Sequence, residues 1–307
     1  MRLGRPVVAV VGCLVGFAGW AAPAAVAAEQ GATFDANGVT LWYEVRGDGP
    51  GTPLVVVNGG PGFDHSYLHC SAAWDRLAQG RKVIFYDQRG NGRSSALKDG
   101  MACGLTEQIA DLHALRNHLG LQKMDLLGHS WGGYLVMAYA ARHPERISHL
   151  LIVDSGAPKI QDTVFLFKNI YPEKVARQDA AAFGVELGDE KAIAADMSEY
   201  LSMLFYSAEA REAFLARSSS FKYTQRVNKA VWSDLQRFDL NPELAKFKFP
   251  TLVVTGRYDF NVAPSVAWSI HKAIAVSEFA VFEKSGHLPF CEEVDDFVAR
   301  VQAFLAK

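Results

Sequence analysis

Short runs of apolar, β-branched residues recur along this 307-residue chain, and stretches with helical patterning separate them. Continuous apolar runs of this kind are typical of strands that are buried on both faces. Because helices of about 10–15 residues stand between the runs, the pattern predicts a mostly parallel α/β sheet with helices on both faces. The core strands expected are Leu54–Asn58, Lys82–Tyr86, Met124–Leu127, Ile147–Val153, Thr251–Thr255 and Glu278–Phe282.

An exposed strand and a set of helices complete this expectation. Val39–Val45 alternates in the way of a half-solvated strand, and Asn37-Gly38 before it has the composition of a turn. The helices expected in the sheet domain are Ala72–Ala78, Thr106–Leu119, Gly132–Arg142, Pro264–Ala273 and Glu292–Leu305.

The alternation of strands and helices stops between Ala157 and Lys248. This stretch has helix-like patterns and almost no β-branched runs. We therefore expect one sheet domain, made of residues 29–156 and 249–307, which an inserted helical cap of residues 157–248 interrupts.

The first 28 residues have the pattern of a secretory signal peptide. They carry only two charges, an apolar run extends from Val7 to Trp20, and Ala25-Val26-Ala27 fits a small-x-small cleavage site. We expect a secreted or periplasmic protein whose mature chain has no stable membrane span. Two alternatives stay open, namely an uncleaved N-terminal membrane anchor and lipidation of Cys13.

Composition narrows the classes of function. Half of the residues are apolar and 21% are charged, which is typical of a globular protein and excludes a disordered chain. The formal net charge is −2 and there is no basic cluster, so nucleic acid is not expected as a partner. The partner expected is a small-molecule or short-peptide substrate, and the oligomeric state is left open.

Three cysteines follow the expected signal peptide: Cys70, Cys103 and Cys291. In an oxidising compartment an odd number allows at most one disulfide and leaves one thiol free, and the sequence does not select the pair. None of the three has the spacing of metal ligands, so no metal is expected. The loop Gly59–Gly62 lacks the Lys-Ser/Thr ending of a phosphate-binding loop, and no other cofactor is expected.

The segment Gly128-His129-Ser130-Trp131-Gly132 lies between an expected strand and an expected helix. This is the setting of a nucleophile elbow, in which a tight turn exposes a serine and glycines let the two backbone segments pass closely. The helix that follows directs its N-terminus, including the Trp131 amide, at a developing oxyanion. We expect Ser130 to be a catalytic nucleophile.

A serine nucleophile requires a base, and the base requires an orienting acid. In an architecture with this elbow the chain order is serine, acid, histidine. Asp259 and His287 each follow one of the last two expected strands, so both lie at carboxyl ends of strands, where open α/β sheets place their active sites. We expect both to be catalytic. Asp154, after the fourth core strand, is the rival acid.

Two further loops follow expected strands. Asn58-Gly59-Gly60-Pro61-Gly62 has backbone amides that can approach a ligand closely, and the Gly60 amide is expected to complete the oxyanion hole beside that of Trp131. The charged segment Asp87–Ser94 is interpreted as a salt-bridged brace without a catalytic role.

Together these motifs resemble the α/β-hydrolase superfamily and, within it, the proline iminopeptidase-like serine hydrolases of peptidase family S33. The likeness lies in Gly59–Gly62, Asp87–Ser94, the elbow around Ser130, Gly256-x-x-Asp259 and Gly286-His287, and it covers about residues 33–156 and 250–305. It implies an α/β-hydrolase fold with a cap domain. It also implies an aminopeptidase that releases an N-terminal residue, such as proline, from short peptides through an acyl-enzyme.

The cap departs from the pattern of that family. Aminopeptidases of this kind use acidic cap residues to hold the free α-amino group of the substrate, and the corresponding stretch Val227–Asp234 contains no glutamate. Asp234 and the upstream Glu199 are the substitutes expected here, although Lys229 disfavours an amine-binding site. A carboxylesterase or amidase of the same fold therefore stays open as an alternative. A non-catalytic ligand-binding homologue is the alternative from another class.

Overall fold

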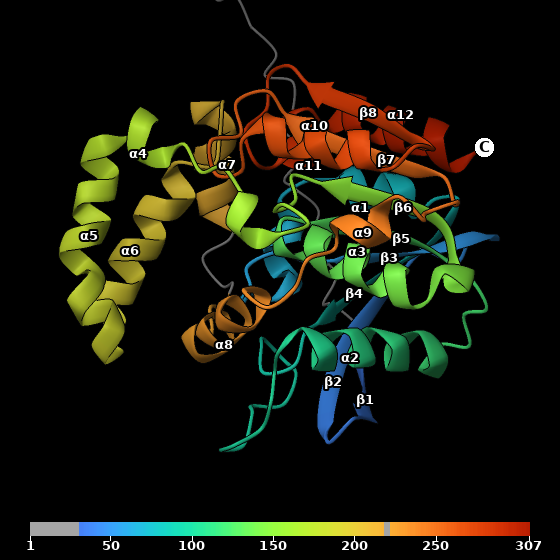
Figure 1. Cartoon of the computed structure of the whole chain (residues 1–307), viewed down its shortest axis with the longest axis horizontal. Coiled ribbons are helices and arrows are strands. Elements are labelled where there is room, and N and C mark those ends of the chain that lie inside the picture. The colour runs from blue at the N-terminus through green and yellow to red at the C-terminus, as the bar shows by residue number, and fades with distance from the viewer. Residues whose placement is uncertain (1–30, 218–221) are drawn as a thin grey trace, which may run out of the picture.

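One eight-stranded sheet, with the strand order β1-β2-β4-β3-β5-β6-β7-β8, organises the molecule (Figure 1). A computed structural model describes residues 31–217 and 222–307, so the expected signal peptide at residues 1–28 lies outside the described residues. The strands are β1 Gly31–Ala36, β2 Val39–Arg46, β3 Gly51–Val57, β4 Arg81–Asp87, β5 Met124–His129, β6 Ile147–Val153, β7 Thr251–Gly256 and β8 Ser277–Phe282. The pairs from β4 to β8 are parallel, which confirms the expected fold class.

The first strand, β1, is absent from the sequence-based expectation. It pairs with β2 in antiparallel register, with Ala36 opposite Val39, and β2 in turn pairs antiparallel with β4. Asn37 and Gly38 form the two-residue turn and have φ angles of 51° and 80°. Positive φ at both positions is the hairpin geometry that favours Asn-Gly, so the turn that was expected before one strand joins two.

Helices cover both faces of the sheet, as expected (Figure 1). α2 (Leu105–His118), α3 (Trp131–Arg142) and α10 (Pro264–Ala273) contribute to the apolar cluster on one face. α1 (Ala73–Leu77) and α12 (Val294–Leu305) contribute to the cluster on the other, and the short α11 (Pro289–Glu292) precedes α12. The pleat of β3 divides its residues between the two faces. Val55 and Val57 join the first cluster, while Leu54 and Val56 join the second.

Between β6 and β7 the chain leaves the sheet, and we call residues 157–248 the helical insertion. Its helices are α4 Phe167–Ile170, α5 Pro172–Leu187, α6 Glu190–Ser202, α7 Ala208–Arg217, α8 Gln225–Leu235 and α9 Asn241–Leu244. α5 and α6 pack against each other and lie to one side of the sheet (Figure 1). Over the ranges described, none of the helices combines the length and the apolar character that a membrane span requires.

Parallel strands place their carboxyl ends at one edge of the sheet, and this edge carries the candidate site. The loop from Asn58 follows β3, Ser130 follows β5, Asp259 follows β7 and His287 follows β8. The helical insertion begins at the same edge, after β6. The fold therefore brings together segments that are up to 229 residues apart in the sequence.

Candidate active site

Ser130 occupies a tight turn between β5 and α3. Its backbone angles are φ 57° and ψ −123°, a conformation that a non-glycine residue rarely adopts. Glycine is required on both sides, because a Cβ at Gly128 would collide with the carbonyl of Gly132, and one at Gly132 would collide with the carbonyl of Val57. The Ser130 amide donates to Val153 O at 2.9 Å. This is the geometry of a nucleophile elbow, with the strain located at the serine.

His287 and Asp259 form a buried hydrogen-bonded pair. His287 Nδ1 lies 2.7 Å from Asp259 Oδ2, and both side chains are buried. Asp259 Oδ1 accepts from the amides of Asn261 and Val262, at 2.9 Å each, so both carboxylate oxygens are engaged. When Nδ1 donates its proton to Asp259, the lone pair stays on Nε2, which is the tautomer that a general base requires.

The structure brings Ser130 and His287 to one small cavity without joining them directly. Both line it, together with Gly60 and Tyr67. His287 Nε2 instead lies 3.1 Å from Asn261 Nδ2, and no hydrogen bond links it to Ser130 Oγ among the residues that the structure describes. Catalytic hydrogen bonds are often loose before substrate binds and tighten in the complex. In the structure, the Asn261 side-chain amide therefore contacts the His287 nitrogen that would act as the base. No sequence motif indicates this contact.

The rival acid, Asp154, lies beside the pair and contacts it differently. Its Oδ1 accepts from the Gly256 amide at 2.9 Å, and its backbone has a positive φ of 45°. Burial and the adjacent negative charge of Asp259 hold the pKa of Asp154 well above its usual range. The carboxylate in contact with His287 is therefore that of Asp259, and Asp154 lies behind it.

The glycine loop after β3 contributes to the wall of the cavity beside Ser130. The Gly59 amide already donates to the Tyr67 hydroxyl at 2.6 Å, and Pro61 has no amide hydrogen. Gly60, which has a φ of 123°, lines the same cavity as Ser130 and Trp131. Of this loop, Gly60 and Pro61 line the main cavity, and of these two only Gly60 has an amide hydrogen.

A buried chain of hydrogen bonds connects this loop to the histidine loop, and sequence reasoning missed it. The Tyr67 hydroxyl lies 2.6 Å from His129 Nδ1, and His129 Nε2 lies 2.8 Å from His287 O. Burial, and next the proximity of His287, hold the pKa of His129 well below its usual range, so this imidazole is neutral. His129 is the variable residue of the Gly-x-Ser motif, and the only available signal was its adjacency to Ser130.

The segment Asp87–Ser94 is a brace, as interpreted. Arg89 donates to both oxygens of Asp111 on α2, at 2.6 and 2.7 Å, and both side chains are buried. Asp87 accepts from the Arg93 amide at 2.7 Å and from His65. Such paired, buried contacts hold the loop without placing a charge in the cavity.

The main cavity beside Ser130 has a volume of about 270 Å³, and most of its wall is apolar or aromatic. Residues that the helical insertion contributes include Asp196, Met197, Tyr200, Tyr223, Asn228 and Trp232. Asp196 is the single acid among the described residues of this wall, and no lysine or arginine is among them. Its Oδ1 accepts from Gln178 Nε2 at 2.9 Å, and burial raises its pKa.

The two acids expected from the sequence lie elsewhere. Glu199 is on α6 but faces α5, where it forms an ion pair with Arg177 at 2.6 Å. Asp234 accepts from the Leu105 amide at 2.8 Å and so caps the first turn of α2, away from Ser130. Neither lines the main cavity. The correction is that Asp196, one turn before Glu199 on α6, is the acid that faces it.

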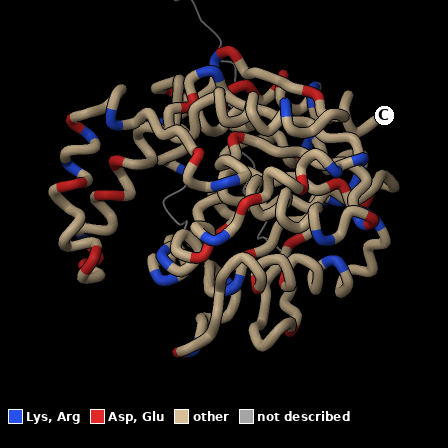
Figure 2. Tube along the Cα trace, viewed as in Figure 1, with Lys and Arg blue, Asp and Glu red and all other residues tan. Residues whose placement is uncertain are grey.

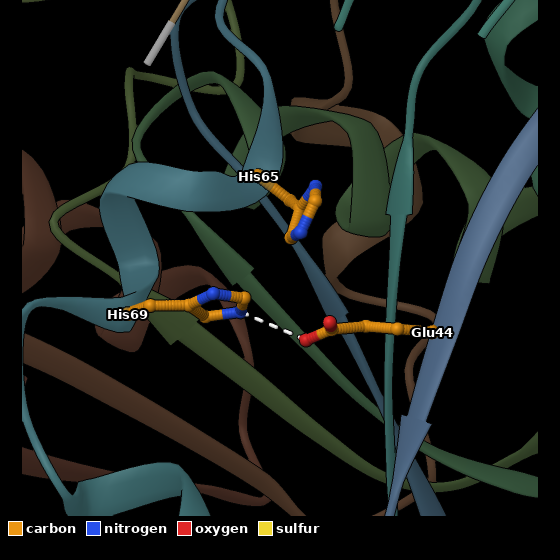
Figure 3. A group of neighbouring side chains, drawn as sticks. All are labelled: Glu44, His65 and His69. Carbon is orange, nitrogen blue, oxygen red and sulfur yellow. Dashed lines mark ion pairs between the residues drawn. The ribbon is translucent and has the colours of Figure 1, made fainter. Parts of the chain in front are cut away.

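Two groups of side chains have the composition of metal ligands. One is Asp154, Asp259 and His287 of the site itself, and the other is Glu44, His65 and His69 (Figure 3). In the second group Glu44 Oε1 lies 2.9 Å from His69 Nε2 and 3.0 Å from Arg46 Nε. Although burial acts in the opposite direction, His69 and Arg46 lower the pKa of Glu44. The Arg46 guanidinium already contacts Glu44 Oε1, the oxygen that a metal ion would require. We therefore interpret this group as an ion-pair cluster and assign no metal to it.

One disulfide forms, within the limit set by the cysteine count. Cys70 and Cys291 are bonded, with a Cα–Cα distance of 5.9 Å, and Cys103 is a buried free thiol. The bond joins the 3₁₀ helix His65–Cys70, after the glycine loop, to α11, after His287. It therefore ties together the two loops that flank Ser130.

The sheet topology and the elbow serine define a class, the hydrolases of the α/β fold. The family described as "alpha/beta hydrolase fold" matches residues 52–294, and the chain belongs to it as a proline iminopeptidase-like serine hydrolase. The proline iminopeptidase of Lactobacillus helveticus is 31% identical over 282 residues, which cover 87% of this chain and 95% of the relative. That of Saccharolobus solfataricus is also 31% identical, over 87% of this chain and 89% of the relative.

A solved structure shows the same fold. The α/β-fold family hydrolase from Bacillus anthracis superimposes with a TM-score of 0.74 at 24% identity, covering 90% of this chain and 99% of the other. The chain is therefore an enzyme whose fold and relatives agree with the resemblance drawn from its motifs.

Proposed function

We propose that this enzyme is an exported aminopeptidase that releases an N-terminal residue, such as proline, from short peptides through an acyl-enzyme. The observation that carries the proposal is that Ser130 lines two cavities. His287, which is paired with Asp259, lines the small one, and Asp196 lines the main, mostly apolar one. The names of the two relatives support the same substrate class.

We assign each step of the proposed reaction to a named group. Ser130 Oγ attacks the carbonyl carbon of the scissile bond while His287 Nε2 takes the hydroxyl proton, and Asp259 stabilises the imidazolium. The amides of Gly60 and Trp131 stabilise the oxyanion. The imidazolium then gives its proton to the leaving amine. Water, activated in turn by His287, cleaves the ester and restores Ser130.

The helical insertion acts as a cap that selects the substrate. It supplies the far wall of the cavity, so only a small or extended substrate reaches Ser130. Asp196 is the group that we assign to the α-ammonium of the substrate. Burial raises the pKa of Asp196, and an ammonium beside it would favour the ionised form, so both charges gain from the contact.

A comparison of free and blocked substrates tests this proposal. The purified mature enzyme is assayed on proline arylamide, on its N-acetylated form and on a short-chain aryl ester. An aminopeptidase cleaves the free arylamide and loses activity when the amine is blocked. Equal activity on the free and blocked forms, with faster ester cleavage, would assign the enzyme to the carboxylesterases instead. The apolar wall and the Gln178–Asp196 hydrogen bond are the observations that favour this second candidate.

We also propose export, with cleavage of residues 1–28. The pattern of that segment supports it, and the Cys70–Cys291 disulfide suits an oxidising compartment. N-terminal sequencing of the protein from the native host, after cell fractionation, tests it. A new N-terminus near residue 29 in the exported fraction is expected. Retention of Met1 in the membrane fraction, or a lipid at Cys13, would replace this proposal with an anchored enzyme.

A further inference from the structure

The loop that carries His287 is attached to two different parts of the molecule. Glu293 Oε2 accepts from the Lys284 amide at 2.8 Å and from the Ser285 hydroxyl at 2.6 Å, which fixes the loop to its own domain. On the other side, the His287 amide donates to Leu204 O of the helical insertion at 2.7 Å. The histidine is therefore held partly by a segment outside the sheet domain.

Glu292 strengthens this second attachment. Its Oε1 accepts from the Ser207 amide, just before α7, at 2.8 Å, and its Oε2 accepts from the Gly286 amide at 2.6 Å. One carboxylate thus bonds a backbone N–H of the insertion and the N–H of the residue before the histidine. The two segments are in direct contact, because a Cβ at Gly286 would collide with the carbonyl of Leu204.

The helix that carries Glu292, α11, is itself fixed. Cys291, next to Glu292, forms the disulfide with Cys70, so α11 is covalently tied to the 3₁₀ helix that follows the glycine loop. A side chain on a fixed helix with both oxygens engaged has little freedom to move. The position of the insertion is thereby transmitted to the loop of the catalytic histidine.

We propose that Glu292 is a positioning residue that seats the helical insertion on the His287 loop and so holds the imidazole in register with Ser130. The inference rests on the serine-hydrolase mechanism proposed above. Glu292 touches neither the substrate nor the reacting atoms, and it acts through the backbone of Gly286.

Protonation weakens this contact. Burial raises the pKa of Glu292 to about 7, the surrounding backbone amides act in the opposite direction, and the charge of Glu293 adds to the rise. The titratable groups that interact with Glu292 are Glu293 and Tyr171. A protonated oxygen is a poor acceptor, so one of the two amide bonds weakens as the pH falls through about 7. The contact is thus strongest above this pH.

The test measures the second-order rate at which a fluorophosphonate labels Ser130, in the wild type and in Glu292→Gln, from pH 5.5 to 8.5. The variant turns one acceptor into an NH₂ group that faces a backbone N–H. We expect the wild type to label about tenfold faster at pH 8, because a small displacement of the base costs at least that much. We expect this ratio to approach one at pH 5.5, where Glu292 of the wild type is itself protonated.

Two further variants and a stability measurement separate the outcomes. Glu292→Asp keeps the charge but is too short to reach both amides, so it should lose a similar factor at pH 8. Glu283→Gln, which removes an exposed partner of Arg257 near the same loop, should label like the wild type. Thermal midpoints establish that each variant is folded. A wild type that does not label would refute the proposed mechanism, whereas a labelling wild type with a ratio of one, or a ratio constant with pH, would overturn the role of Glu292.

Discussion

The carboxyl edge of the sheet and the helical insertion differ in which side chains they bury and which they expose. At the sheet edge polar groups are inside, where Asp259 is fully buried and both of its oxygens accept hydrogen bonds. In the insertion several large apolar side chains are exposed, and Phe183 on α5 exposes 76% of its surface. Acidic and basic residues occur together along α5 and α6, mostly at the surface (Figure 2).

The contrast shows which region tolerates change. A buried, fully hydrogen-bonded network loses much when one member is removed, because its partners are left without hydrogen bonds. Exposed ion pairs are screened by water and contribute little. We therefore expect the chemistry to depend on a few residues of the sheet edge, and the choice of substrate to depend on the insertion. The predictions below test that division.

The largest effect is expected for Ser130→Ala. Without the Oγ nucleophile, turnover of arylamides and esters should fall by about 10⁶-fold in kcat, while the fold persists because alanine fits the turn as serine does. Steady-state assays with the thermal midpoint as a folding control measure this. Turnover within tenfold of the wild type would remove Ser130 from the chemistry.

The next effect distinguishes the two buried acids. Asp259→Asn should lower kcat by about 10⁴-fold, since the amide stabilises the wrong tautomer of His287 and not the imidazolium. Asp154→Asn should cost less than about tenfold, because asparagine reproduces a neutral carboxyl and still accepts from the Gly256 amide. Comparison of the two kcat values decides which acid serves the histidine, and a reversed order would favour Asp154.

In the insertion the expected effect is smaller and lies in binding. Asp196→Asn should raise KM about tenfold for substrates with a free α-amine and leave esters without an amine unchanged, because only the charged hydrogen bond is lost. The control is Glu199→Gln, which breaks the exposed pair with Arg177 and should keep KM within twofold. If Glu199→Gln raised KM more than Asp196→Asn, the assignment of the cavity acid would be wrong.

The last expected change concerns stability and not turnover. Replacing Cys70 and Cys291 with serine should lower the free energy of unfolding by about 2–4 kcal/mol, as measured by urea denaturation, because the bond restricts the unfolded chain between residues 221 positions apart. Arg177→Gln in the insertion should leave the urea midpoint unchanged. Equal losses of unfolding free energy in both variants would mean that the surface contacts of the insertion contribute as much to stability as the disulfide does.

The same division explains what the sequence could predict. Ser130, Asp259 and His287 each follow a strand, and a strand is recognised from a few apolar residues, so their meeting at one edge follows from the topology alone. The hairpin strand β1 was missed because its six residues, Gly31–Ala36, form no continuous apolar run and leave most positions exposed.

The sequence could not identify Asp196 as the acid of the main cavity, and the reason is different. Asp196 and Glu199 stand three positions apart on α6, on neighbouring parts of the helix surface, and a rotation of less than one turn exchanges their surroundings. Only the packing of α5 against α6 decides that Glu199 meets Arg177 and that Asp196 faces the cavity. The Tyr67–His129 link likewise depends on side-chain contacts across 62 positions, which no local pattern encodes.

The role of Ser130 as the nucleophile is tested most directly by locating the acyl group during turnover. The enzyme is mixed with a slowly hydrolysed proline aryl ester, quenched in acid, digested and mapped by mass spectrometry, with Ser130→Ala treated in parallel. We expect the acyl mass on the peptide that contains Ser130 in the wild type and on no peptide of the variant. An unmodified Ser130 peptide during active turnover, or the acyl group on another residue, would contradict it.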